Sequence, residues 1–231
     1  MAHLKPYKSC VRYGLVWVSL AEEPQGQIPQ IDEDGAEGYR RINNPVQLWQ
    51  TSATRMTDNF LDIAHFPWVH TGTFGNAQRT NVPDFEIKTL PGNYTGYDYD
   101  VIAENPGGAN LTSGQESQVV SRHMSTGFHL PFSVRSTILY ENGIQHVLLL
   151  LPTPIDDNNS YFTFVVWRND DFSISGEDVV TFDRSIGNED KVMLEKLSGL
   201  LPLESKALAN TRSDKASARW RQDFRKLLDA S

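Results

Sequence analysis

The sequence holds a single cysteine, Cys10, among its 231 residues. One thiol excludes an internal disulfide and any metal cluster that needs several cysteine ligands from this chain. Long apolar runs are also missing. The longest, residues 147–151, has the length of a strand, whereas a membrane helix needs roughly 18 apolar residues. We therefore expect neither a membrane span nor a fold held together by disulfides.

Positive charge is scarce as well. There are 21 Lys and Arg against 29 Asp and Glu, which gives a formal net charge of -8. Because phosphate binding needs a basic surface, this charge disfavours nucleic acid as a partner. The N-terminus lacks the order of charged, apolar and small residues that marks a secretory signal. The composition is otherwise ordinary for a globular protein, and we expect a cytoplasmic one.

Turn residues divide the middle of the chain into short segments rich in strand-forming residues. No helical pattern separates these segments, so they predict an antiparallel sheet. The pair Asn142-Gly143 is typical of a tight hairpin. The predicted strands cover residues 84–90, 97–103, 117–124, 133–140, 145–152 and 161–168.

Apolar residues at helical spacing mark three further segments. Thr57 or Asp58 can serve as the N-cap of the first of these segments, residues 55–65. Residues 11–20 are rich in strand formers but lie too near the N-terminus to have an obvious sheet of their own. The whole pattern predicts one α+β domain, an antiparallel sheet covered by helices. The predicted helices cover residues 55–65, 177–200 and 215–228, and the predicted loops cover 22–38 and 71–83.

Two histidines, His65 and His70, flank Pro67 and give the strongest local signal of the sequence. On an unbroken helix, residues five apart diverge by about 140°. Pro67 disfavours the α conformation at Phe66 and interrupts the helical hydrogen bonds, so we expect His70 to turn back toward His65. Two neutral imidazoles suit iron, zinc or copper. The pattern predicts a metal site.

A polar stripe leads to the first of these histidines. Asn59, Asp62 and His65 are spaced by three and would share one side of a helix. A histidine near apolar residues is more often structural than metal-binding, and the spacing alone leaves that alternative open. We interpret the other histidines of the strand region as structural, with His129 a candidate for a pocket wall; the three are His123, His129 and His146.

A carboxylate, Asp190, falls on the apolar stripe of the second predicted helix, between Ile186 and Leu194. A buried carboxylate is costly unless it is paired or bound to a metal. Three explanations stay open. The helix begins late, near Asn188, and leaves Asp190 exposed in its first turn; Asp190 pairs with a buried arginine; or Asp190 is the anionic ligand that two histidines lack. Two His and one carboxylate form the facial triad of non-heme Fe(II) oxygenases.

Residues 59–75, which read NFLDIAHFPWVHTGTFG, resemble the mononuclear-iron motif of Rieske non-heme iron oxygenases. The most similar branch contains vanillate O-demethylase and dicamba monooxygenase. Glu189-Asp190 resembles the later segment that carries the iron-binding aspartate. Residues 13–18 resemble the strand that leads from the Rieske domain to the catalytic domain, and residues 219–228 fit the terminal helix. The resemblance therefore covers nearly the whole chain.

The resemblance implies a helix-grip fold of the Bet v1/START type, in which a curved antiparallel sheet wraps a helix. It implies that His65, His70 and Asp190 bind a mononuclear Fe(II). Asp62 matches the aspartate that links such a histidine to the Rieske centre of a neighbouring subunit and gates electron transfer. Asn59 matches a polar position near the iron.

The Rieske centre itself has no ligands in this sequence. A Rieske [2Fe-2S] cluster needs two Cys and two His, but the N-terminal part offers only His3 and Cys10, outside any Cys-x-His or Cys-x-x-His box. We therefore interpret residues 1–38 as a residual Rieske-domain strand and linker, and residues 39–231 as the mononuclear-iron catalytic domain. The cluster is expected on a lost segment or on a separate chain.

The implied activity is that of a terminal oxygenase component. Such an enzyme uses Fe(II) and O2 to hydroxylate, or to O- or N-demethylate, a small aromatic or heterocyclic substrate. Electrons would come from an NAD(P)H reductase and a Rieske ferredoxin, or from a Rieske-containing subunit in a homotrimer or hetero-oligomer. We expect the pocket walls on the concave sheet face and the loops after His70, with Phe60, Trp68 and Phe74 nearby.

Two other functions remain open at this stage. The same three ligands can hold zinc in a hydrolase. A helix-grip scaffold can also bind a ligand without catalysis. The presence of Asp62 favours the oxygenase over a binding module, since its family role requires that electrons arrive.

Overall fold

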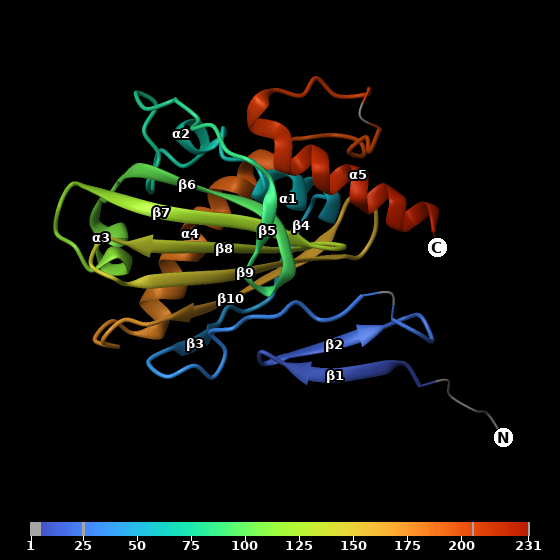
Figure 1. Cartoon of the computed structure of the whole chain (residues 1–231), viewed down its shortest axis with the longest axis horizontal. Helices are drawn as coiled ribbons and strands as arrows, with labels where there is room; N and C mark the ends of the chain where they lie inside the picture. Colours follow the sequence, from blue (N-terminus) through green and yellow to red (C-terminus); the bar gives the residue numbers. More distant parts are fainter. Residues whose placement is uncertain (1–5, 25, 205, 231) are drawn as a thin grey trace.

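A curved antiparallel sheet from the middle of the chain organises the computed structural model, which describes residues 6–24, 26–204 and 206–230 (Figure 1). His3 lies outside the described residues. The sheet has eight strands in the order β3-β10-β9-β8-β7-β6-β5, with β4 also pairing with β10. These strands are β3 (Arg40–Asn43), β4 (Gln47–Trp49), β5 (Lys88–Leu90), β6 (Tyr94–Glu104), β7 (Val119–His129), β8 (Ser133–Tyr140), β9 (Gln145–Pro154) and β10 (Ser160–Arg168).

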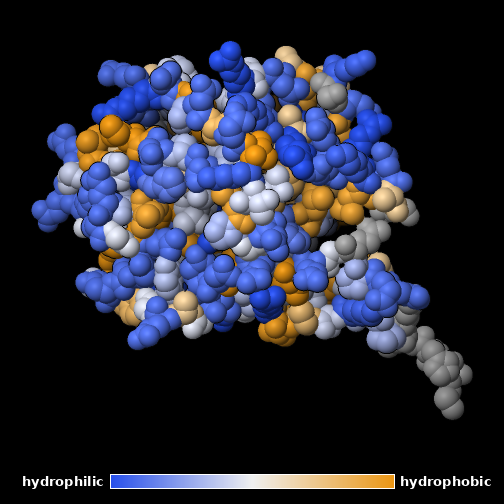
Figure 2. Space-filling view, in the orientation of Figure 1, coloured by the Kyte–Doolittle hydropathy of each residue, from blue (hydrophilic) through white to orange (hydrophobic). Residues whose placement is uncertain are grey.

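Strand β7 alternates between a buried and an accessible face, as the period of two allows, whereas β10 is buried on both faces. In β7, Val120, Arg122 and Met124 are buried, whereas Val119 and His123 are exposed. Figure 2 views the sheet from the side turned away from the helix α4, and that face is mostly hydrophilic. The face toward α4 carries one part of the core, and the N-terminal Tyr13 packs with Val165 and Trp167 of β10 in another.

Helices pack on the buried face. The long helix α4 lies behind the sheet in Figure 1, and its Val179, Val180 and Leu194 join a cluster with Phe162 and Phe164 of β10. This is the predicted α+β arrangement, a sheet wrapped around a helix. The helices are α1 (Ala53–Phe60), α2 (Phe66–Val69), α3 (Gly107–Ser113), α4 (Gly176–Leu194) and α5 (Lys215–Asp229), with short 3-10 turns at Pro91–Asn93 and Arg212–Asp214.

The first helix differs from its prediction at both ends. It begins after Ser52, whose hydroxyl oxygen accepts a hydrogen bond from the backbone N–H of Arg55 at 3.3 Å. Thr57 and Asp58 therefore lie inside the helix and do not cap it. The helix ends at Phe60. The prediction that it continues through residue 65, with Asn59, Asp62 and His65 along one side, was therefore wrong. The second predicted helix likewise ends at residue 194 instead of 200.

The N-terminal segment forms a sheet of its own, contrary to expectation. Strands β1 (Lys8–Arg12) and β2 (Leu15–Ser19) pair as an antiparallel hairpin. Tyr13 and Gly14 make its turn with φ of 59° and 73°. The Tyr13 ring packs edge-on against Trp167 with centroids 5.1 Å apart, so the hairpin is anchored to β10.

Candidate metal centre

A short helix places the two histidines. His65 is the N-cap of α2 and His70 is its C-cap. Pro67 sits in the first turn of α2, where a missing N–H removes no helical hydrogen bond. Phe66 is helical, so the expectation that Pro67 would keep it out of the α conformation was wrong. The proline starts this helix, and the two imidazoles converge from its two ends.

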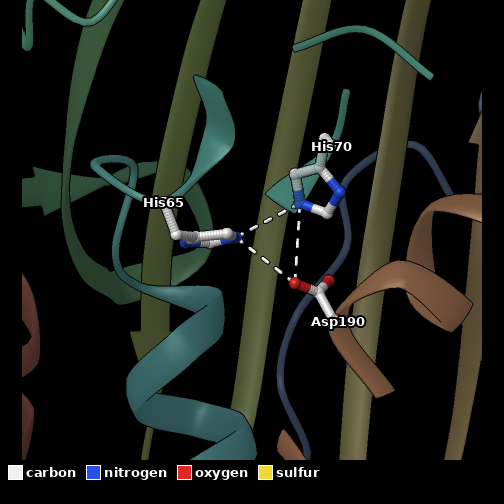
Figure 3. A group of neighbouring side chains, drawn as sticks. All are labelled: His65, His70 and Asp190. Carbon is white, nitrogen blue, oxygen red and sulfur yellow. Dashed lines mark hydrogen bonds and ion pairs between the residues drawn. The ribbon is translucent and has the colours of Figure 1, made fainter. Parts of the chain in front are cut away.

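Three side chains meet at one point (Figure 3). The Nε2 atoms of His65 and His70 are 3.2 Å apart. The Asp190 Oδ1 atom lies 3.3 Å from His65 Nε2 and 3.5 Å from His70 Nε2. Among the described residues, these three form the group of His, Cys, Asp or Glu side chains whose ligand atoms lie close enough to hold a metal ion.

The environment of Asp190 decides between the three explanations for its position. It is buried and lies near the C-terminal end of α4, fourteen residues after the first residue, Gly176, so the helix does not begin late. Its Oδ1 atom accepts a hydrogen bond from Asn59 Nδ2 at 2.9 Å, and within the described part of the chain its ion pairs involve the two histidines and no arginine. Asp190 therefore faces the histidines as the one anion of the cluster.

The donor set fits a divalent metal ion. Two imidazole nitrogens and one carboxylate oxygen suit iron or zinc. Burial disfavours a charge on His65, yet hydrogen bonds to Asp190 and Asp62 outweigh it and raise the pKa of His65 to about 9. Burial lowers the pKa of His70 and keeps it neutral. The metal-free chain thus holds one proton where a cation would sit, and metal binding would displace it.

Carboxylates contact the Nδ1 atoms of both imidazoles, on the side of each ring away from the converging Nε2 atoms. His65 Nδ1 lies 3.1 Å from Asp62 Oδ2, and Asp62 also accepts hydrogen bonds from the backbone of Ala64 and His65. His70 Nδ1 lies 3.0 Å from Glu189 Oε2. Such contacts fix the tautomer, leaving Nε2 as the ligand atom. Sequence reasoning assigned no role to Glu189, although its place directly before Asp190 was a usable signal.

Glu189 is itself held by the loop after α2. Thr73 Oγ1 donates to its Oε2 at 2.7 Å, and the Gly72 backbone N–H donates to its Oε1 at 3.0 Å. A Cβ atom at Gly72 would come within 2.6 Å of Oε1. A side chain at position 72 would therefore displace the Glu189 carboxylate from the loop.

An apolar cavity of about 120 Å³ adjoins the three side chains, between α4 and the concave face of the sheet. Phe60 and Phe74 line it as expected, and the Phe74 ring stacks on His70 with centroids 4.8 Å apart. Trp68 does not, because 62% of it is exposed. Besides the candidate ligands His65 and His70, His146 also lines this cavity, whereas His129 does not.

The two remaining histidines lie away from the cluster. His123 is exposed and contacts Asp100 at 2.7 Å, and His129 Nδ1 lies 3.1 Å from the carbonyl oxygen of Leu130.

Within the described residues, no helix combines the length and the apolar character that crossing a membrane requires.

The sequence matches one family model over most of its length. The model of the vanillate O-demethylase oxygenase C-terminal domain covers residues 49–230. A probable methylxanthine N7-demethylase from Pseudomonas sp. (strain TJI-51) is 27% identical over 221 residues, which are 91% of this chain and 73% of that protein. The methylxanthine N1-demethylase of Pseudomonas putida is 23% identical over 222 residues, 95% of this chain and 60% of that one.

Solved structures share the fold at lower identity. The Pseudomonas putida CBB5 protein NdmA with caffeine superposes with a TM-score of 0.77 at 20% identity, over 97% of this chain and 62% of that chain. Dicamba monooxygenase bound to dicamba gives a TM-score of 0.69 at 18% identity, over 97% of this chain and 70% of that chain. The chain thus spans about three fifths of the length of the N1-demethylase, and its helix-grip fold is confirmed.

Proposed function

Because the chain belongs to the family of vanillate O-demethylase oxygenase C-terminal domains, we propose that it is the catalytic domain of a Rieske-type oxygenase that demethylates or hydroxylates a small aromatic or heterocyclic compound. The observation that carries this proposal is the convergence of His65, His70 and Asp190 beside an apolar cavity. In this proposal the three side chains hold Fe(II). When bound, Fe(II) supplies open coordination positions at which O2 is activated.

The overall reaction defines what the protein must provide. In demethylation, the methyl group on oxygen or nitrogen is oxidised to formaldehyde. One atom of O2 enters formaldehyde and the other leaves as water, with two electrons and two protons supplied from outside. The protein's share is to position the methyl group, to exclude bulk water and to admit electrons.

The surroundings of the three side chains suit these tasks. The rings of Phe66 and Phe74 pack around His70, and Phe60 closes another side of the cavity, so the site is shielded by aromatic side chains. Asn59 holds the Asp190 carboxylate by its hydrogen bond. We assign to Asn59 the orientation of that ligand.

We assign the entry of electrons to Asp62. Its carboxylate contacts His65 Nδ1, and 24% of the side chain remains exposed, so it connects the buried site with the surface. Although burial disfavours its charge, the hydrogen bond to His65 lowers the pKa of Asp62 and keeps it anionic. The electron donor in this proposal is a Rieske ferredoxin or a Rieske-containing subunit served by an NAD(P)H reductase, in a homotrimer or hetero-oligomer. Residues 1–38 are then a remnant and linker of a Rieske domain.

A turnover screen tests this function. The protein is loaded with Fe(II), supplied with a Rieske ferredoxin, its reductase and NAD(P)H, and given methoxylated and N-methylated aromatics and heterocycles. We expect formaldehyde and the demethylated product from at least one substrate. Asp190→Ala should abolish formaldehyde release, whereas His123→Ala, a change at an exposed histidine, should preserve it.

Two results would contradict the proposal. A zinc-loaded protein that releases product without consuming O2 would indicate a hydrolase. A protein that binds Fe(II) and aromatic ligands, yet turns over none of them with any electron donor, would indicate a binding module.

A further inference from the structure

Two buried polar atoms lie side by side on the wall of the cavity, away from the three candidate metal ligands. His146 is 1% exposed and Asp183 is 9% exposed, and both line the cavity. His146 Nε2 and Asp183 Oδ2 are 3.2 Å apart, but they are not aligned for a hydrogen bond, and neither atom has a hydrogen-bond partner within the described part of the chain. Buried polar groups are almost always paired, so an unpaired donor beside an unpaired acceptor requires an explanation.

The protonation of His146 follows from its other nitrogen. Arg168 Nη1 lies 3.3 Å from His146 Nδ1. Because a guanidinium only donates, Nδ1 must be the acceptor. The proton of the neutral imidazole is then on Nε2. Arg168 is fully buried and donates from Nε to Asp170 Oδ2 at 2.5 Å, an oxygen that also accepts from Arg40 at 2.6 Å. The cavity therefore presents one N–H donor and one carboxylate acceptor side by side.

The pair has a fixed place relative to the metal cluster. Asp183 and Asp190 are both buried on α4, seven residues apart. Seven residues are nearly two helical turns, so the two carboxylates lie on the same face about 10 Å apart along the helix axis. His146 pairs with Ile138 across the sheet, and Ile138 lines the same cavity. A single ring bound in the cavity can therefore contact His146 and Asp183 at one side and lie near His65 and His70 at the other.

We propose that His146 and Asp183 recognise the cis-amide edge of a neutral heterocycle, that is, a ring carbonyl next to a ring N–H. The carbonyl oxygen accepts from His146 Nε2–H, and the ring N–H donates to Asp183 Oδ2. A methyl group on the opposite side of the ring then points toward the metal cluster. This inference rests on the proposed function and narrows its substrate class. A cavity of about 120 Å³ favours a single ring, since an engineered cavity of about 150 Å³ holds benzene.

A competing recognition element lies on the same wall. Arg122 is 6% exposed, lines the cavity, and has no hydrogen-bond partner for its Nε within the described residues. It could hold the carboxylate of an aromatic acid. However, its guanidinium lies 4.8 Å above the Phe74 ring, a contact that stabilises the cation. An anion in this cavity would also face the Asp183 carboxylate. The neutral heterocycle satisfies two unpaired atoms and adds no charge.

Equilibrium binding to the 231-residue protein, both metal-free and loaded with Zn(II), tests the proposal without turnover. The probes are 1-methyluracil, which has the N–H beside a carbonyl, and 1,3-dimethyluracil, in which a methyl group replaces that N–H. Calorimetry should show at least about tenfold tighter binding of 1-methyluracil, because the dimethyl compound leaves the Asp183 carboxylate unpaired. Vanillate serves as the anionic probe.

Substitutions separate the two residues. Asp183→Leu should abolish the preference between the two uracils, and the isosteric Asp183→Asn should reduce it several-fold if the leucine variant fails to fold. His146→Phe should weaken both uracils alike and leave their ratio unchanged, because both keep the carbonyl. His123→Phe, the matched control on the exposed face of β7, should change nothing.

Equal affinity for both uracils, or an unchanged preference in folded Asp183 variants, would overturn the proposal. Tighter binding of vanillate that is lost in Arg122→Gln would overturn it in favour of an anion pocket. Since binding is measured without O2 or reductant, a preference for 1-methyluracil with no formaldehyde release would contradict the proposed function alone.

Discussion

At the scale of single residues, the position of Asp190 determines what His65 and His70 can do. Without a nearby anion, burial would disfavour any positive charge between the two converging imidazoles. With Asp190 within 3.5 Å of both Nε2 atoms, the cluster can hold one positive charge, as a proton or as a metal ion. Asp62 and Glu189 then fix which nitrogen of each ring faces that charge.

Glu189 gives a prediction at this scale. Glu189→Gln should weaken metal binding about 10- to 100-fold, because the His70 tautomer and ring orientation lose their anionic partner. A chelator competition with Zn(II) measures the affinity. The matched control is Glu177→Gln, in the exposed first turn of the same helix, which should bind metal normally. Equal affinities for the two variants would remove Glu189 from the metal centre.

The pKa of His65 gives a second prediction. Its value of about 9 lies above the ordinary 6.5, so the protonated form stabilises the metal-free fold below pH 6.5, and this stabilisation is lost as the pH rises through 9. The loss amounts to at most about 3.4 kcal/mol in the free energy of unfolding. Urea titrations of the metal-free protein at pH 6 and pH 10 measure it. In His65→Gln the part of the pH dependence that belongs to His65 should vanish, and a persistent pH dependence of the same size would assign it to another group.

At the scale of elements, the periodic segments were predictable and the short ones were not. The strand over residues 133–140 and the hairpin at Asn142-Gly143 follow from alternation and turn chemistry, and both are confirmed. Helices α2 and α3 and strands β3 and β4 escaped prediction because three to seven residues do not display a period. The proximity of His146 to Asp183 depends on the tertiary packing of β9 against α4, which no local pattern contains.

The loop after α2 gives a prediction at this scale. In Gly75→Ala, the added Cβ would lie 2.3 Å from the carbonyl oxygen of Phe66, so the loop must move away from α2. We expect a loss of about 1–3 kcal/mol in the free energy of unfolding, together with weaker metal binding. Thermal denaturation and chelator competition measure the two effects. Gly107→Ala is the control, because its Cβ would meet nothing within 4 Å. Similar behaviour of both variants would show that the loop does not constrain the site.

At the scale of the whole molecule, three candidate metal ligands lie beside a cavity, whereas the sequence offers only Cys10 as a possible thiolate ligand. In the proposed function, the electron donor is therefore a Rieske centre whose ligands lie outside this sequence, and Asp62, with 24% of its side chain exposed, is the proposed point of electron entry. The helix-grip fold and the three metal-binding candidates were predictable because the residues 59–75 match a family motif. The identity of the substrate was not, since it depends on side chains from several strands and helices.

Asp62 gives the prediction at this scale. Asp62→Asn should weaken Fe(II) binding as Glu189→Gln does, and should in addition lower the rate of formaldehyde formation per bound iron at least about tenfold, because the proposed point of electron entry beside His65 loses its charge. Iron content and turnover are measured on the same samples. Glu204→Gln, at an exposed carboxylate, is the control. If Asp62→Asn keeps the full rate with a Rieske ferredoxin, the electrons enter elsewhere.

The central claim is that His65, His70 and Asp190 form one iron site. Anaerobic titration of the metal-free protein with Fe(II) tests it most directly. We expect one Fe(II) per chain, a loss of that binding in both His70→Ala and Asp190→Ala, and unchanged binding in His123→Ala. Stoichiometric Fe(II) binding that persists in the folded His70→Ala and Asp190→Ala variants would contradict the account.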